Sequence, residues 1–189
     1  MNGAIGNLAI SLGAMQVARK IPFDDPQVLQ YARIGYVATQ LSILGLYYYI
    51  SMVVKKKNDQ TVLKYVEPPS PMSPDTEGKL VTTTVRDYDL SEVSKLLRAV
   101  YMGILMMAFL HGYLKFTQPL FIQSLMGLKG LYDAKPIAIH ILGKPAEGDL
   151  KRPFKVAPGL FGGGGASGPQ TDKAAITEAE KKVGGKKDD

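Results

Sequence analysis

Charged residues avoid three stretches of the chain and crowd into the segments between them. None occurs in residues 1–18, 34–54 or 99–114, and lysine and arginine gather directly after each run. Soluble proteins spread charge along amphipathic elements, whereas a bilayer-spanning helix needs about 20 uncharged residues. The pattern predicts an all-α membrane protein: a bundle of about four helices, two strong and two short, with a loop able to form a small β-sheet and a flexible basic tail.

The second uncharged run has the clearest boundaries. Asp24 or Asp25 suits the position that caps a helix, and Pro26 suits its first turn, where the missing N–H costs nothing. The helix is predicted to continue to about Val54, and Lys55, Lys56 and Lys57 mark its exit from the membrane.

The first and fourth predicted helices are short. A helix over Gly3–Ala18 is roughly 24 Å long, less than the ~30 Å hydrocarbon core. It can span a thinned bilayer, re-enter it or lie at the interface, and we favour a span. The fourth helix, Gln118–Tyr132, can likewise form half of a membrane hairpin or lie at the interface.

The third helix begins with an apparent capping box, Asp89 followed by Glu92. Its first turns are amphipathic, and it is wholly uncharged from Ala99 to Leu114. Three short runs look β-like: Thr61–Val66, Leu80–Val85 and Ile137–Leu142. The second and third of these runs are predicted to pair as a small cytosolic sheet.

Basic residues place both the 55–98 segment and the tail after Lys129 in the cytosol. An even number of crossings must then separate them, so the third and fourth helices form a hairpin. The predicted organisation is an N-terminal membrane hairpin (1–57), a polar cytosolic loop (58–88), a C-terminal membrane hairpin with an amphipathic lead-in (89–133) and a basic, largely flexible cytosolic tail (134–189).

Residue chemistry gives no sign of an enzyme. The chain has no cysteine and two histidines, so thiol catalysis and cysteine-ligated metal sites are excluded, and we expect neither cofactor nor metal. Gly162–Gly165 lacks the residues of a phosphate loop and is predicted to be a tether. His111 is either a hydrogen-bonded interfacial histidine or a proton relay, and the first is the simpler interpretation. The net charge of +6 fits lipid headgroups or nucleic acid.

The apolar runs carry uncharged polar side chains. Helix packing through amide and hydroxyl groups explains them simply, and a partly hydrated groove is the functional alternative. Such a groove lowers the cost of moving a polar segment of another protein through hydrocarbon. Methionines in the third and fourth helices are either core or an adaptable surface. We select four candidates for the groove: Asn7, Ser11, Gln40 and Gln123.

Several segments resemble one family from end to end and in order. The family is that of a fungal endoplasmic-reticulum membrane protein first described with inorganic phosphate transport and later assigned to SRP-independent targeting. The segments that carry the resemblance are Gln16–Pro26, Lys64–Pro68, Val81–Leu90, His111 with Tyr113–Lys115, and Gly143–Lys155.

The resemblance implies a multi-pass protein of the endoplasmic-reticulum membrane that helps to insert client membrane proteins. Its implied partners are the Sec translocon, the ribosome with its ribosomal RNA, other SRP-independent targeting components, clients and lipids, with no small-molecule substrate. Two alternatives stay open: an accessory role in phosphate transport or permease maturation, and a scaffold that recruits a ribosome or receptor. The candidates for headgroup, ribosome or partner contact are Lys55, Lys56, Lys57, Lys151 and Arg152.

Overall fold

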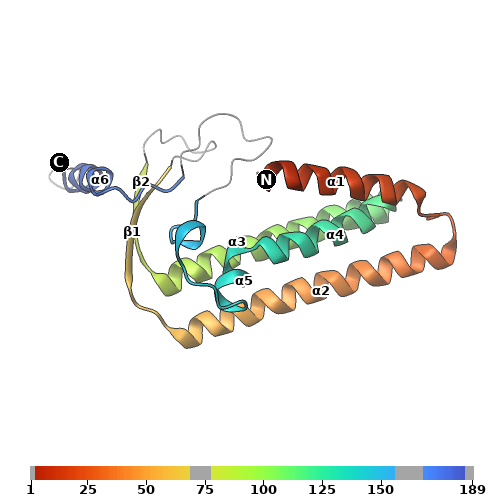
Figure 1. The fold of residues 1–189 in the computed structure, drawn as a ribbon, viewed down its shortest axis with the longest axis horizontal. Helices are drawn as coiled ribbons and strands as arrows, with labels where there is room; N and C mark the ends of the chain where they lie inside the picture. The colour runs from red at the N-terminus through yellow and green to blue at the C-terminus, as the bar shows by residue number, and fades with distance from the viewer. Residues whose placement is uncertain (1–2, 69–77, 156–167, 186–189) are drawn as a thin grey trace.

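The computed structural model describes residues 3–68, 78–155 and 168–185. Four helices run along one common long axis, and a two-stranded sheet lies at one end of them (Figure 1). The predicted small helical bundle with a small sheet is confirmed. Its elements are α1 (Gly3–Lys20), α2 (Pro26–Lys57), β1 (Val62–Glu67), β2 (Lys79–Thr84), α3 (Val85–Met107), a π-helical segment η1 (Ala108–Tyr113), α4 (Gln118–Asp133), α5 (Lys135–His140), a 3₁₀ turn η2 (Gly148–Leu150) and α6 (Lys173–Gly185).

Helix α2 has the boundaries that its sequence predicts at the start. The Asp25 carboxylate accepts a hydrogen bond from the backbone N–H of Gln27 at 2.8 Å, and Pro26 occupies the first helical position. The helix continues one turn past the prediction, through the three lysines, and ends at Asn58 in the left-handed conformation. A capping side chain at one end and an Asn at the other satisfy backbone groups that the helix leaves unpaired.

The cap of helix α3 lies five residues earlier than predicted, so the capping box at Asp89 is wrong. The cap is Thr84, the last residue of β2, whose hydroxyl accepts from the Asp87 N–H at 3.2 Å. Asp89 is instead buried in the second turn, at 2% exposed. Its carboxylate serves a tertiary contact, described below, that local spacing does not reveal.

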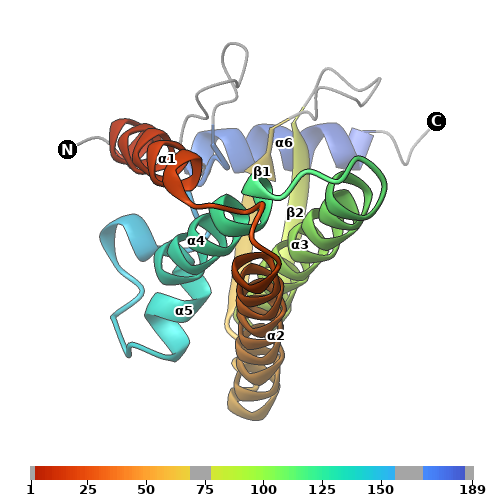
Figure 2. The same ribbon diagram turned by 90° about the vertical axis from the view of Figure 1, so that its right-hand side faces the viewer.

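The four long helices pack with α4 between α1 and α2 (Figure 2). The largest core cluster joins α2 to α3, α4 and α5, and it centres on Ile50 and Val93, both fully buried. A second cluster near the opposite end joins Tyr36, Met107 and Leu120. At that end Arg33 donates to His111 Nε2 at 3.0 Å, and His111 Nδ1 lies 2.9 Å from the Phe116 carbonyl. Because Nε2 accepts, Nδ1 carries the proton, so His111 is a fully hydrogen-bonded histidine.

The predicted sheet partner of Leu80–Val85 is wrong. Strand β2 pairs antiparallel with β1, from Val62 opposite Thr84 to Glu67 opposite Lys79. The run predicted as the partner strand largely forms α5, in which Pro136 and the next three residues are all buried. A short run buried on every side has no periodicity that distinguishes a strand from a helix, which explains the error.

Part of the segment expected to be a largely flexible tail is packed into the fold. Phe154 is 7% exposed and forms a cluster with Tyr65 and Tyr88, and its backbone N–H donates to the Tyr88 hydroxyl at 2.7 Å. Farther on, residues Lys173–Gly185 of the same segment form α6. The run Gly162–Gly165, predicted as a tether, lies outside the described residues. Residues 134–155 therefore belong to the folded unit.

Within the described residues, two helical segments are long and apolar enough to cross a membrane, α2 and the continuous α3–η1. Only 28% and 11% of their most apolar stretches are buried inside the structure. The core helix of a soluble protein buries most of its surface, so these exposed apolar faces call for lipid or a partner. Figure 1 shows the sheet, α5 and the end of α2 together at one end of the bundle.

Candidate functional site

Two of the predicted groove residues line a single cavity. Gln40 from α2 and Gln123 from α4 face a cavity of about 300 Å³ between α2, α3 and α4, here called the Gln40–Gln123 cavity. Gln40 is 7% exposed, and the buried Gln123 Oε1 has no hydrogen-bond partner among the described residues. An unsatisfied buried acceptor costs about 1–3 kcal/mol. The cavity therefore offers an acceptor to a polar group that enters it.

Two glycines leave the space that the Gln40 and Gln123 side chains occupy between the helices. A Cβ atom added to Gly103 of α3 would lie 2.7 Å from the Gln123 amide nitrogen. One added to Gly127 of α4 would lie 3.0 Å from Ile43 and 4.0 Å from the Gln40 amide nitrogen. Small residues at these positions let the helices approach closely while the long polar side chains stay between them. The other lining residues are Tyr47, Leu96, Ala99, Val100, Met126 and Gly130.

The other two groove candidates lie outside this cavity. The Ser11 hydroxyl of α1 donates to Met126 Sδ at 3.5 Å, and Met126 is part of the cavity wall. Asn7 lies one helical turn earlier and is exposed. The structure thus brings Gln40 and Gln123 together, links Ser11 to them through one methionine, and leaves Asn7 on the outer surface of α1.

The sequence left open whether the methionines are core residues or an adaptable surface, and α3 contains both kinds. Met107 is 4% exposed and belongs to the core cluster with Tyr36 and Leu120. Met102 and Met106 on the same helix are about 60% exposed. Core packing therefore explains one of them, while two present flexible, polarizable side chains on the outer face of α3.

The five basic residues predicted to contact headgroups, the ribosome or a partner differ in exposure and in whether their charge is already paired. Lys55, Lys56 and Lys57 are exposed at the end of α2, and Lys151 is exposed after η2. Arg152 is not free: its side chain is 13% exposed and its Nε and Nη2 donate to the Asp89 carboxylate at 2.5 and 2.6 Å. Lysine ammonium groups remain available for anions at this end, while the Arg152 guanidinium is engaged within the fold.

Asp89 is the centre of a buried cluster that sequence reasoning missed. Besides the two bonds from Arg152, its Oδ2 lies 2.7 Å from His140 Nε2, and both side chains are at least 96% buried. The carboxylate ties the start of α3 to α5 and to the chain beyond η2. Its partners are 51 and 63 residues away, so no local spacing could have indicated them.

The cluster keeps Asp89 ionised. Burial raises the pKa of the Asp89 carboxyl, but the hydrogen bonds and charges of His140 and Arg152 together outweigh it and hold the pKa below its usual value. Asp89 lies in the amphipathic lead-in of α3, more than two turns before the uncharged run. The arrangement is a structural lock on the polar end of the bundle: it joins the start of α3 to α5 and to Arg152.

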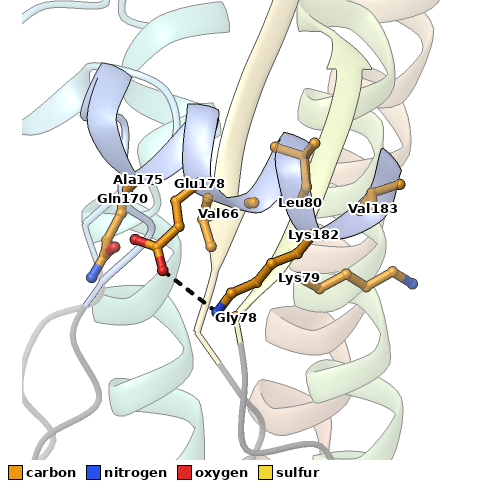
Figure 3. Close-up of a pocket in the computed structure, with 10 residues that line it drawn as sticks. Val66, Gly78, Lys79, Leu80, Gln170, Ala175, Glu178, Lys182 and Val183 are labelled. Atoms are coloured by element: carbon orange, nitrogen blue, oxygen red, sulfur yellow. Dashed lines mark ion pairs between the residues drawn. The ribbon is translucent and has the colours of Figure 1, made fainter. Parts of the chain in front are cut away.

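A larger cavity of about 740 Å³ lies between the sheet and α6 (Figure 3). Its wall includes Val66 and Leu80 from the strands and Val183 from α6. Gln170 pairs with Val66 through two backbone hydrogen bonds of 2.9 Å, and Lys64 forms an ion pair with Glu180 at 3.0 Å. Within α6, Glu178 pairs with Lys182 at 3.5 Å. These contacts hold α6 across the strands.

Comparison with known proteins gives consistent matches along the chain. The family described as phosphate transport (Pho88) matches residues 1–187. SRP-independent targeting protein 3 of Saccharomyces cerevisiae is 47% identical over 185 residues, covering 96% of this chain and 95% of the relative. Its homolog in Schizosaccharomyces pombe is 40% identical, covering 92% and 89%, and an uncharacterized protein of the same yeast is 45% identical, covering 87% and 81%. No solved structure matches significantly.

Proposed function

The chain belongs to the Pho88 family, and we propose that it acts in SRP-independent targeting at the endoplasmic-reticulum membrane, where it helps client transmembrane segments to insert. The name of its yeast relatives supports the pathway. The Gln40–Gln123 cavity supports the mechanism, because it places two amides, one with an unpaired acceptor, between helices whose outer faces are apolar. A client's polar flank finds hydrogen bonds there while its apolar residues enter lipid.

Clients should contact the mouth of this cavity during insertion. Ala99 of α3 is exposed and lines the cavity, so a photo-crosslinking amino acid at this position should capture the transmembrane segment of a stalled nascent chain. The matched control is Leu41 of α2, which is 64% exposed on the membrane face but does not line the cavity. Equal capture at both positions, or none at either, would contradict the proposal and favour random lipid contact or a recruiting scaffold.

We further propose that the polar end of the bundle faces the cytosol, together with the Sec translocon and the ribosome. The exposed lysines at this end suit lipid headgroups and ribosomal RNA. Lys55–Lys57 form the end of α2. Val54, directly before them, packs in one cluster with Ile137 of α5, and α5 leads on to Lys151. This packing supports an even number of crossings between the two basic regions.

The absence of native cysteine makes this topology directly testable. In sealed microsomes, Lys56→Cys and Lys151→Cys should both react with a membrane-impermeant maleimide added outside. Asp24→Cys, exposed in the α1–α2 connection at the opposite end, should react only after permeabilisation. Reaction of Lys56→Cys and Lys151→Cys from opposite sides would refute the four-crossing arrangement.

The family description favours, as a second candidate, an accessory role in phosphate transport or permease maturation. A direct carrier of phosphate needs cationic side chains within the membrane-crossing runs. Residues 34–54 and 99–114 contain no lysine or arginine. An indirect role, through insertion of a phosphate permease, agrees with both the family description and the residues.

A further inference from the structure

A second cavity lies where α2 leaves its uncharged run. It has a volume of about 320 Å³ and is enclosed by the end of α2, the start of α3, α5 and the loop after α5. We call it the interface cavity. Val54, the last residue of the uncharged run, and Ile139 give it an apolar wall, and Lys57 stands one turn beyond Val54. Such a boundary between apolar and cationic walls is where lipid headgroups lie.

Positive charge exceeds negative charge in this cavity. Four cationic side chains line it, Lys57, Arg86, Lys144 and Arg152, against the carboxylates of Asp59 and Asp89. Asp89 is already occupied by Arg152 and His140, and the Asp59 carboxylate accepts from the N–H and hydroxyl of Thr61 at 3.0 and 2.6 Å. Within the described residues neither Lys57 nor Lys144 has an ion-pair partner.

Two buried nitrogen atoms of the same cavity lack partners. Arg86 Nε and His140 Nδ1 are both buried and make no hydrogen bond within the described part of the chain. Since buried polar groups are almost always paired, two orphans in one cationic cavity indicate a missing ligand. The Arg86 N–H is a donor. His140 Nε2 donates to the Asp89 carboxylate, so Nδ1 is the ring nitrogen left for a ligand.

We propose that the interface cavity binds the headgroup of an anionic polyol phospholipid, such as phosphatidylinositol. The phosphate diester accepts from Arg86 Nε and is neutralised by Lys57 and Lys144, and a headgroup hydroxyl forms a hydrogen bond with His140 Nδ1. The acyl chains continue along the apolar surface beside Val54. A bound lipid would stabilise the contact between Asp89 of α3 and His140 of α5. The inference depends on the membrane placement of α2 but not on client insertion.

The test uses the full chain purified in detergent, with lipid retention measured by native mass spectrometry and lipid-induced shifts of Tm. Short-chain phosphatidylinositol should be retained and should raise Tm, whereas phosphatidylcholine should do neither. Arg86→Gln/Lys144→Gln should bind phosphatidylinositol about tenfold more weakly, because two cationic contacts are lost. Lys144→Gln alone, at an exposed position, should weaken binding less and covers the case in which the double variant folds poorly.

The matched control is Lys55→Gln/Lys56→Gln, which removes the same amount of charge from the same end of the bundle but outside the cavity. It should retain phosphatidylinositol binding. Equal loss in this control, or no preference for phosphatidylinositol over phosphatidylcholine, would overturn the proposal in favour of general charge attraction. Inorganic phosphate and soluble glycerophosphoinositol form separate arms: an equal Tm shift with inorganic phosphate would reassign the cavity to free phosphate. Client insertion is measured independently, so either proposal can fail alone.

Discussion

Asp89→Ala is expected to lower the free energy of unfolding by about 3–5 kcal/mol, because it leaves buried cationic and polar groups without their partner. Asp89 is 2% exposed and accepts two bonds from Arg152 and one from His140. Its loss should release α5 and the chain around Phe154 from the start of α3. Thermal unfolding in detergent, followed by circular dichroism and by proteolysis after residue 134, measures the effect.

Two comparison variants separate this lock from general charge effects. Asp87→Ala removes a half-exposed carboxylate from the same turn region, and its ion pair with Arg86 at 3.5 Å should contribute less than about 1 kcal/mol. Asp89→Ala/Arg152→Ala removes the orphaned guanidinium as well and should recover part of the lost stability. A loss no larger in Asp89→Ala than in Asp87→Ala would show that the cluster does not lock the fold.

The same carboxylate predicts how stability depends on acid. The pKa of Asp89 is below the usual 3.8 in the folded chain, so its contribution is complete above about pH 4 and is lost as the pH falls through the lower folded value. Asp89→Ala should therefore flatten the acid limb of the stability curve.

Gln40→Leu/Gln123→Leu is expected to reduce client insertion on the order of tenfold, because an inserting polar flank loses two hydrogen-bond partners worth about 0.6–2 kcal/mol each. Stability should be unchanged or slightly higher. Gln123 Oε1 is already unpaired, and an apolar group of similar size removes the cost of burying it. The purified chain, reconstituted in liposomes with a client that carries a C-terminal transmembrane segment, gives the measurement through protease protection.

The control for this variant is Gln16→Leu/Ser42→Leu, which makes the same kind of replacement at exposed positions of α1 and α2. It should insert clients normally. Asn7→Leu and Ser11→Leu, also predicted as groove residues, should have smaller effects, since they lie outside the cavity. Full insertion by the Gln40→Leu/Gln123→Leu variant would remove the hydrophilic groove from the mechanism while leaving the membership of the family intact.

The helices were predictable where their signals are local. An N-capping Asp25 followed by Pro26, and an uncharged run before three lysines, define α2 without reference to the rest of the chain. The same reasoning failed at Asp89, where a carboxylate with the spacing of a cap is used by residues far along the chain. It failed again at α5, because burial on all sides removes the periodicity on which the distinction depends.

The candidate site shows the same division. Sequence reasoning selected Gln40 and Gln123 because amides are costly inside an apolar run and must be paired or used. It could not tell that these two face one cavity while Asn7 remains outside, since helix rotation is set by packing at Gly103 and Gly127. Arg152 was chosen as a free cation, yet its guanidinium is held by Asp89.

The sequence by itself determined that apolar helices alternate with basic segments, because hydrocarbon excludes charge at every position along a span. The tertiary structure alone decided which polar groups meet: two amides between α2 and α4, and one carboxylate with a histidine and an arginine. These contacts depend on how each helix is rotated about its axis, and they join residues more than fifty positions apart in the sequence. They are fixed by the packing of side chains such as Ile50 and Val93, which no local pattern encodes.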